Sequence, residues 1–320
     1  MKAKPFGMLP VSGSWLRWGG SALLLAAAVL LLPKKELAAA FGQMRWGTPA
    51  AALAIFLMVH VLSALKWCLV VNRSGAGIRL RDGIESYFAG LFSNLFLPSL
   101  IGGDLVTATA ASVKARQAAG VVLGSVLNRL LDVMALAVLL CLAAALDWQA
   151  WALRNPTALR FIEAAAAGLG LAAVAGAVLA PLRPAWLGAA LRKVLKGPKE
   201  AFGAIRRPGL LSLPLAASLM MQLGLAALTA WLGVACGISL GMATWVLAWS
   251  LAKLVALLPV TVSGIGARAL ALAGLLAPFG VPAARAAALG MAWDAVVVCG
   301  GLSAGVIWRL LLWRNRQGRA

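Results

Sequence analysis

The sequence is poor in acidic residues and in histidine. Its 320 residues include 9 Asp and Glu against 29 Lys and Arg, and His60 is the only histidine. The four cysteines lie singly in apolar segments, without the spacing of metal ligands: Cys68, Cys141, Cys236 and Cys299. This set is too small for a typical zinc site, and we expect the cysteines to be reduced and packed between helices. We therefore expect no metal and no other cofactor.

Catalytic patterns are also missing. The sequence has no Ser-His-Asp arrangement, no paired-histidine motif and no Walker loop. A lone His60 is more typical of a hydrogen-bonded packing residue than of a catalyst. General acid–base chemistry stays open, because folding could bring Asp104, Asp132 and Asp294 together. We expect a protein that is not an enzyme, and an intramembrane enzyme acting on a lipid is the least favoured alternative.

Apolar residues are in excess. Hydrophobic residues make up 62% and charged residues 12% of the chain, whereas a soluble domain is roughly half apolar and a quarter charged. Repeated apolar runs approach the ~20 residues that a helix needs to cross a bilayer. They predict an all-α polytopic membrane helix bundle of about eight spans in a single domain, residues 1–320. The predicted spans are residues 20–32, 49–71, 118–146, 161–180, 209–236, 241–262, 269–279 and 286–312.

The positive charge indicates topology. A net charge of +20 would suggest nucleic acid in a soluble protein, but these cations lie mostly between apolar runs and form no basic stripe with exposed aromatics. Residues 181–208 carry many Lys and Arg against the single acid Glu200, which predicts a cytoplasmic loop. We expect a bacterial inner-membrane protein with both termini cytoplasmic, a loop at 147–160, and Lys66 reaching toward the basic loop 72–82.

The stretch from Asn94 to Asp104 is too apolar for a surface loop and too broken for a plain spanning helix. Pro98 removes a backbone donor, while Gly102 and Gly103 allow a sharp turn or a close approach. Irregular backbone occurs at membrane depth only where protein buries it or where it lines a wet cavity. The pattern predicts a re-entrant or broken helix, entering and leaving on one side over residues 84–103. The alternative is a spanning helix that stops at Ile101 with the Gly pair as its C-cap.

A similar pattern recurs near residue 260. Pro259, Gly264 and Gly266 again follow an apolar run and interrupt it. Two interrupted segments in corresponding halves indicate an internal repeat and a central binding site. The predicted repeat is centred on residues 84–146 and 241–312, with Pro98, Gly102, Gly103, Pro259, Gly264 and Gly266 as hinge residues.

Charged residues inside the apolar runs mark the candidate site. Arg129 and Asp132 share a helical face and are expected to pair. Lys253 and Asp294 form a second expected pair. Arg268 follows the second glycine break and is either a ligand for a headgroup phosphate or an interfacial anchor. The candidate substrate-binding residues are Asp104, Arg129, Asp132, Lys253, Arg268 and Asp294.

These motifs together resemble the lysylphosphatidylglycerol synthase transmembrane-region family, whose members are also described as flippase-like. The resemblance rests on the motifs Leu97-Pro98-Ser99 to Gly102-Gly103-Asp104, then Asn128-Arg129-Leu130 with Asp132, then Leu258-Pro259 to Gly264-Ile265-Gly266-Ala267-Arg268. It implies about eight helices, re-entrant segments and a lipid-headgroup cavity. Two family charges are replaced here, by Thr107 and by Ala269. The family's soluble aminoacyl-transfer domain is absent from the sequence, so lysyl transfer is not expected.

Two functional hypotheses follow. The first is a flippase-like protein that moves an anionic phospholipid or lipid-linked substrate through a polar cavity, which spares the headgroup its desolvation cost. The second is a scaffold that moves nothing and holds a lipid or glycan biosynthetic enzyme, as the loss of the two charges suggests. Expected partners are the lipid substrate and the membrane, with a biosynthetic enzyme or a second copy of the chain as further candidates. No nucleic acid is expected.

Overall fold

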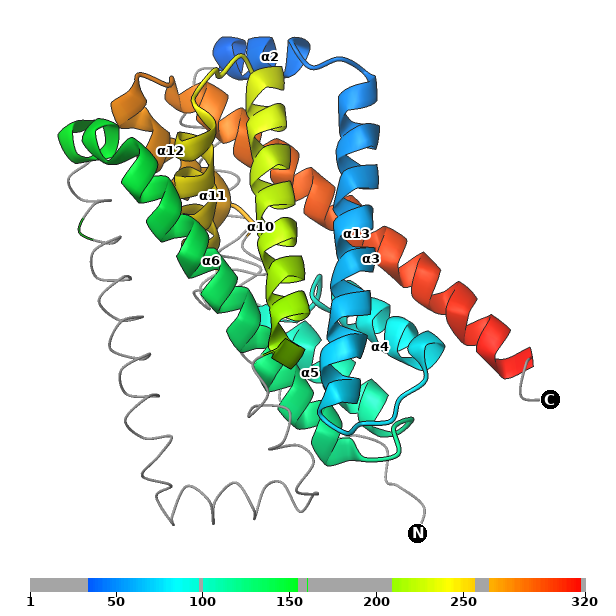
Figure 1. Cartoon of the computed structure of the whole chain (residues 1–320). Helices are drawn as coiled ribbons and strands as arrows, with labels where there is room; N and C mark the ends of the chain where they lie inside the picture. The colour runs from blue at the N-terminus through cyan, green and yellow to red at the C-terminus, as the bar shows by residue number, and fades with distance from the viewer. Residues whose placement is uncertain (1–33, 98–99, 155–159, 161–208, 257–264, 318–320) are drawn as a thin grey trace.

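The computed structural model describes residues 34–97, 100–154, 160, 209–256 and 265–317 (Figure 1). The helices of this part are α2 (Lys34–Gly42), α3 (Gly47–Arg73), α4 (Leu80–Ser93), α5 (Leu100–Ser112), α6 (Ala118–Arg154), α10 (Gly209–Ala235), α11 (Met242–Ala256), α12 (Ala267–Leu276), the 3-10 turn η2 (Ala277–Phe279) and α13 (Ala283–Gln317). The expected all-α membrane bundle is confirmed. Some predictions lie outside the described residues: the spans at 20–32 and 161–180, the segment 181–208, and the hinge residues Pro98, Pro259 and Gly264.

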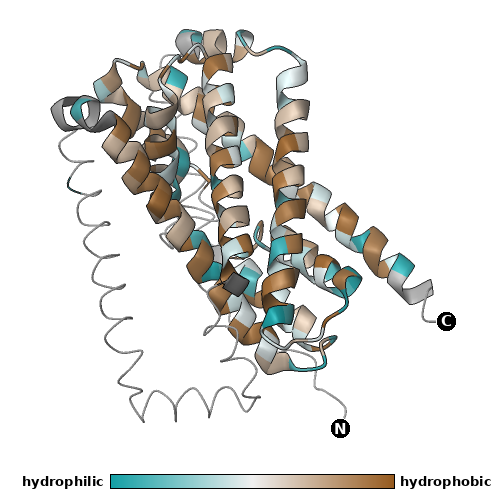
Figure 2. Cartoon of the chain, in the orientation of Figure 1, coloured by the Kyte–Doolittle hydropathy of each residue, from teal (hydrophilic) through white to brown (hydrophobic). Residues whose placement is uncertain are grey.

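Four helices in the described part are long and apolar enough to cross a membrane: α3, α6, α10 and α13. Each coincides with a predicted span, and Figure 2 shows apolar residues along most of their length. The prediction of a loop at 147–160 is wrong for residues 147–154, because α6 continues to Arg154. The added residues, Asp147 to Arg154, contain no Gly or Pro and several good helix formers. A helix can therefore extend beyond the apolar part of its sequence.

Two short helices, α4 and α5, form what we call the first broken pair. They have 14 and 13 residues, so each spans about 20 Å and neither crosses about 30 Å of hydrocarbon. The pair packs closely side by side (Figure 1). The alternative of a spanning helix capped by the glycines is wrong, because α4 ends at Ser93 and Gly102 and Gly103 lie in the first turn of α5.

A second broken pair is formed by α11 and α12, which have 15 and 10 residues and are also too short to cross alone. The start of α11 and the end of α12 lie at one end of the bundle, and the start of α4 and the end of α5 lie at the other (Figure 1). The end at which α11 starts is marked by the hydrogen bond from Arg285 Nη1, near the start of α13, to the carbonyl oxygen of Gly237, just after α10. Described residues next to both breaks, among them Gly103 in the first pair and Arg268 in the second, line the same cavity inside the bundle. The internal sequence repeat itself stays a prediction.

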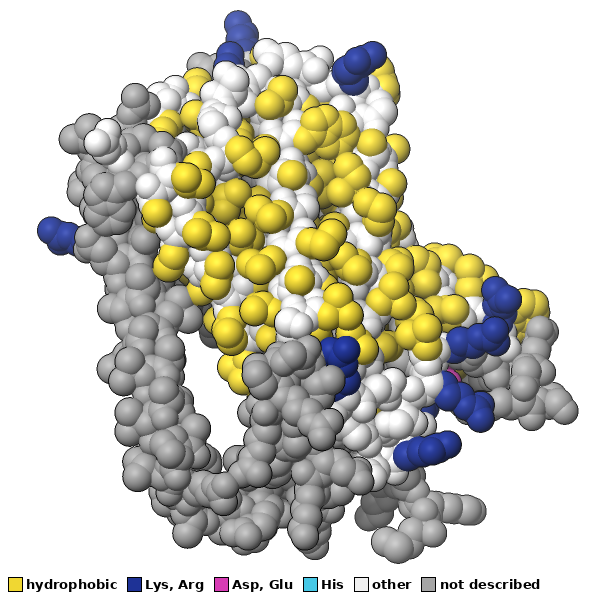
Figure 3. Space-filling view, in the orientation of Figure 1, with side chains coloured by type: hydrophobic (Ala, Val, Ile, Leu, Met, Phe, Trp, Pro, Cys, Tyr) yellow, Lys and Arg dark blue, Asp and Glu magenta, His cyan; other side chains and the backbone are white. Residues whose placement is uncertain are grey.

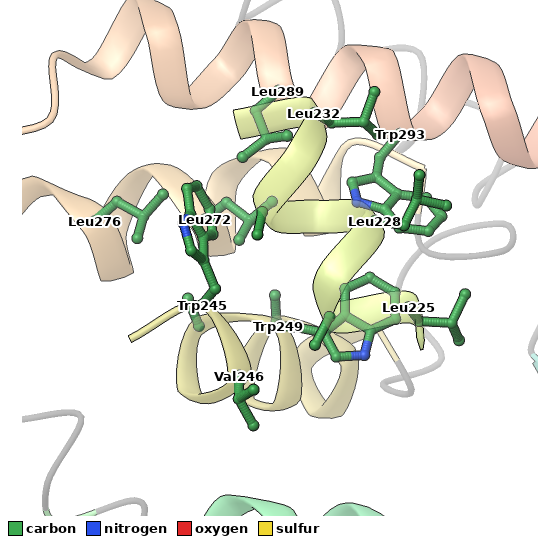
Figure 4. Packing of buried hydrophobic residues seen from close by; sticks show 14 of the residues in the cluster. Leu225, Leu228, Leu232, Trp245, Val246, Trp249, Leu272, Leu276, Leu289 and Trp293 are labelled. Carbon is green, nitrogen blue, oxygen red and sulfur yellow. The ribbon is translucent and has the colours of Figure 1, made fainter. Parts of the chain in front are cut away.

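The largest apolar core joins α10, α11, α12 and α13 around buried tryptophans (Figure 4). Trp249 on α11 stacks on Trp293 of α13 with ring centroids 4.9 Å apart. Trp245 and Leu272 fill the space between α11 and α12 and are almost completely buried. This packing fixes the second broken pair against α13.

The outer surface is apolar along the long helices. Figure 3 shows hydrophobic side chains across this face, with Lys and Arg gathered toward its two ends. Large exposed side chains such as Leu130, Met134 and Val138 follow one side of α6. An apolar belt between charged ends is what contact with lipid requires.

Candidate functional site

A cavity of about 230 Å³ lies between the two broken pairs, and five of the six predicted substrate-binding residues line it: Asp104, Arg129, Asp132, Lys253 and Arg268. The sixth, Asp294, lies behind Arg268 and contacts it. Arg129 lies about 16 Å along α6 from Ala118, and Asp294 about 16 Å along α13 from Ala283, at 1.5 Å per residue. Because these helices begin at opposite ends of the bundle, the cavity is near its middle.

Asn94, just after the end of α4, is hydrogen-bonded to the first turn of α5 and joins the inner ends of the first broken pair. Its side-chain oxygen accepts a hydrogen bond from the backbone nitrogen of Gly103 at 2.9 Å. A Cβ on Gly103 would lie 2.2 Å from that oxygen, and a Cβ on Gly102 would lie 2.7 Å from Leu97. These glycines are therefore needed for the close return of the chain, which places Asp104 at the cavity wall.

Arg129 pairs with Asp104, not with Asp132 as the sequence predicted. Its Nη1 lies 3.7 Å from the Asp104 carboxylate, across the contact between α5 and α6. Both side chains are partly exposed, at 39% for Arg129 and 54% for Asp104. The i, i+3 spacing showed correctly that Arg129 and Asp132 share a face of α6. It could not show that each has a nearer partner on another helix.

Asp132 instead forms an ion pair with Lys66 of α3. Ser218 of α10 donates to the same carboxylate at 2.9 Å and accepts from Lys66 at 2.9 Å, and Asn128 contributes a longer hydrogen bond of 3.3 Å. The expectation that Lys66 reaches the basic loop 72–82 is wrong. Its side chain is 1% exposed and points into the bundle, where a carboxylate compensates a charge that would be costly alone.

Lys253 and Asp294 do not pair with each other. Lys253 donates to the amide oxygen of Gln222 at 2.8 Å, and its ammonium lies 5.8 Å from the ring centroid of Trp249. Asp294 accepts from the backbone nitrogen of Gly266 at 2.8 Å and from Arg268 at 3.2 Å. The start of α12 supplies these two donors to Asp294.

Arg268 is a cavity residue and not an interfacial anchor. It is 6% exposed, and its guanidinium lies 5.6 Å from the ring centroid of Trp293. Gly266, directly before α12, has φ of 77°, a conformation that glycine adopts without strain. This backbone turn brings Arg268 and the Gly266 nitrogen to the same carboxylate.

Sequence reasoning missed several cavity residues. Lys66, Tyr87 and Gln222 line the cavity and were not predicted as site residues. A lysine in the middle of an apolar span was the available signal for Lys66. Gln222 is the only amide in the apolar run 209–236 and Tyr87 is the only tyrosine of the sequence, so each also carried a signal. His60 also lines the cavity, and its Nδ1 lies 3.0 Å from the Tyr87 hydroxyl. The expected hydrogen-bonded packing role of His60 agrees with this contact.

The charges at the site are nearly balanced, with one more cation than carboxylate. The cations are Lys66, Arg129, Lys253 and Arg268, and the carboxylates are Asp104, Asp132 and Asp294. Lys253 is the cation for which the described residues provide no carboxylate within ion-pair distance. The site therefore suits a ligand that carries negative charge and needs polar contacts at membrane depth.

Comparison with protein families gives a match over most of the chain. The family model described as lysylphosphatidylglycerol synthase TM region matches residues 15–305. No curated protein and no solved structure gives a significant match to the chain.

Proposed function

The chain belongs to the lysylphosphatidylglycerol synthase TM region family, and from this premise we propose that it moves an anionic lipid or lipid-linked substrate between the leaflets of the membrane. One observation carries the proposal. Four cations and three carboxylates gather around a cavity in the middle of the bundle, and residues of two broken helix pairs from opposite ends line it. Broken helices at mid-depth are the typical setting of substrate sites in transporters.

The physical need is a polar route for the headgroup. A charged headgroup cannot cross hydrocarbon without a large desolvation cost, whereas its acyl chains can stay in lipid. Asp104 and Arg129 suit an entrance, because both line the cavity and remain partly exposed. Apolar side chains such as Leu105 and Leu130 lie beside them and are also exposed. The headgroup would exchange its water for these charged groups while the chains follow the apolar surface.

A translocation assay in liposomes tests this function directly. Purified chain is reconstituted with a fluorescent phosphatidylglycerol, and movement between leaflets is read by dithionite quenching. Arg129→Ala should slow movement at least tenfold. Arg81→Ala, which removes an exposed cation away from the cavity, should leave the rate within twofold. Equal rates for wild type and Arg129→Ala, or no movement above protein-free liposomes, would contradict the proposal.

Two further measurements separate the alternatives. We propose a carrier that catalyses no covalent change, so mass spectrometry should recover the lipid unmodified after incubation. A new lipid product would indicate an enzyme. Stable co-purification with a biosynthetic enzyme, in the absence of any lipid movement, would indicate a scaffold.

We also propose a bacterial inner-membrane location with cytoplasmic termini. Support comes from the basic segment 181–208, which leads into α10 at Gly209. That segment would be cytoplasmic, together with the first broken pair, because α3 and α10 pack side by side and run in opposite directions (Figure 1). Fusion of green fluorescent protein or alkaline phosphatase to the C-terminus tests this topology: fluorescence without phosphatase activity is expected, and the reverse result would refute it.

A further inference from the structure

One wall of the cavity carries hydrogen-bond donors without acceptors. Arg268 and Trp249 line the cavity and are 6% and 4% exposed. Neither Nε of Arg268 nor Nε1 of Trp249 has a hydrogen-bond partner within the described part of the chain. Lys253, one helical turn beyond Trp249, adds an ammonium group held by the Gln222 amide. We call Trp249, Lys253 and Arg268 the donor wall, because their polar groups can only donate.

The donor wall is held in place by contacts that leave these N–H groups unused. Arg268 is fixed through Nη1 by Asp294, which leaves Nε free. The Trp249 ring is fixed by stacking on Trp293, which leaves Nε1 free. Buried donors without acceptors are costly, and an incoming acceptor relieves that cost. Oxyanions accept such bonds most strongly when the donors are already oriented.

Two residues on α5 and α6 have the opposite character. Asn128 donates its amide nitrogen to Asp132 at 3.3 Å, and its Oδ1 is buried without a partner in the described residues. The amide orientation follows from chemistry, since an ionised carboxylate can only accept. Asp104 adds a carboxylate that is 54% exposed. We call Asn128 and Asp104 the acceptor wall, because both residues line the cavity and carry oxygen atoms that can accept hydrogen bonds.

We propose that the cavity recognises a two-part headgroup, with a phosphate on the donor wall and a hydroxyl or ammonium donor on the acceptor wall. A phosphoglycerol or phosphoethanolamine headgroup has both parts. A phosphocholine headgroup has the phosphate but no N–H or O–H, so it leaves Asn128 Oδ1 unpaired. A neutral diacylglycerol leaves the donor wall unpaired. This inference rests on the proposed function only in taking a lipid headgroup as the ligand.

Calorimetric titration of the purified full chain in a non-ionic detergent tests the recognition without transport. Three probes are phospholipids: dihexanoyl phosphatidylglycerol, dihexanoyl phosphatidylethanolamine and dihexanoyl phosphatidylcholine. Two probes lack a phosphate: dihexanoylglycerol and its hemisuccinate. The first two phospholipids should bind about tenfold more tightly than the choline lipid, as one lost hydrogen bond to a buried group implies. Dihexanoylglycerol should show no saturable binding. Equal affinities for the phosphatidylglycerol and the phosphatidylcholine would overturn the acceptor wall. Binding of the hemisuccinate with the same affinity as the phosphatidylglycerol would overturn the selection of phosphate.

Conservative variants separate the two walls. Trp249→Phe keeps the stacked ring and loses Nε1–H, and Arg268→Lys keeps a cation beside Asp294 and loses Nε–H. Each should weaken binding of all three phospholipids about tenfold. Asn128→Ala should leave choline-lipid binding unchanged and abolish the preference for the other two. Trp245→Phe, in the core of the same helix α11, is the matched control and should bind as wild type. Wild-type binding by Trp249→Phe and Arg268→Lys, with unchanged melting temperatures, would overturn the donor wall.

The two proposals fail in different ways. Selective binding with the expected variant pattern, without lipid movement in liposomes, would refute the transport function and support two-part recognition. Lipid movement by wild type that is lost in Arg129→Ala, together with equal binding of every probe, would refute the recognition and support transport.

Discussion

Lys66 on α3 and Asp132 on α6 form an ion pair inside the bundle, and Ser218 on α10 is hydrogen-bonded to both. Three membrane-spanning helices are therefore joined at one point in the cavity wall. A buried ion pair need not be more stable than an apolar packing, but loss of one partner leaves the other charge uncompensated. This asymmetry makes the pair a sensitive test of the structure.

Replacement of Lys66 by Met should destabilise the protein by about 3 kcal/mol, since Asp132 then keeps its charge without a cation. Asp132→Leu should destabilise the protein by a comparable amount, since it leaves the buried Lys66 without a carboxylate. The double variant Lys66→Met with Asp132→Leu should be more stable than either single variant. Thermal melting in detergent measures all three, and additive losses in the double variant would show that the two residues are not coupled.

Replacement of Lys253 by Met should weaken binding of an anionic lipid with little effect on stability. Lys253 has an amide and an aromatic ring as partners, so its loss leaves no carboxylate of the described residues without an ion-pair partner. We expect about a tenfold loss of affinity for dihexanoyl phosphatidylglycerol, or about 1.4 kcal/mol, and a melting temperature close to that of wild type. A large drop in melting temperature with unchanged affinity would assign Lys253 a structural role instead.

Replacement of Gly90 by Ala should separate α4 from α5. A Cβ at this position would lie 1.9 Å from Thr107 Oγ1 and 2.5 Å from the backbone oxygen of Gly103. Because a backbone atom cannot rotate away, we expect a destabilisation of about 1–3 kcal/mol and loss of lipid movement. Gly274→Ala in α12 is the control, since a Cβ there meets no atom within 4 Å. A melting curve for Gly90→Ala that matches this control would contradict the close packing.

Thr107 occupies one of the positions where the family resemblance implies a charge. The structure places it 6% exposed, against Gly90. A long charged side chain at this position would have to displace the contact between α4 and α5. The small Thr107 side chain is therefore compatible with the close packing of α4 against α5.

Replacement of Tyr87 by Phe tests whether His60 is a packing residue. The change removes the hydrogen bond between the Tyr87 hydroxyl and His60 Nδ1 and keeps the aromatic contacts. We expect a loss of about 1 kcal/mol in stability and a translocation rate within twofold of wild type. A rate that falls tenfold or more, without a matching change in melting temperature, would show that this hydrogen bond takes part in transport.

Much of the architecture could be predicted from the sequence. Apolar length defined the four long helices of the described part, because a helix that crosses a bilayer needs a continuous run of such residues. Pro98 marked the break between α4 and α5, since proline interrupts the hydrogen bonds of a continuous helix. Scarce charges in apolar runs identified five residues that line the cavity, because a membrane protein places such charges in its interior.

Only the tertiary structure decided which charges are partners. Helical periodicity shows which face of a helix a residue occupies, but not which helix lies opposite that face. Asp132 therefore pairs with Lys66 and not with Arg129, and Asp294 pairs with Arg268 and not with Lys253. The unpaired donors of Trp249 and Arg268 have the same origin, because helix packing placed both residues at one cavity and gave these N–H groups no acceptor among the described residues.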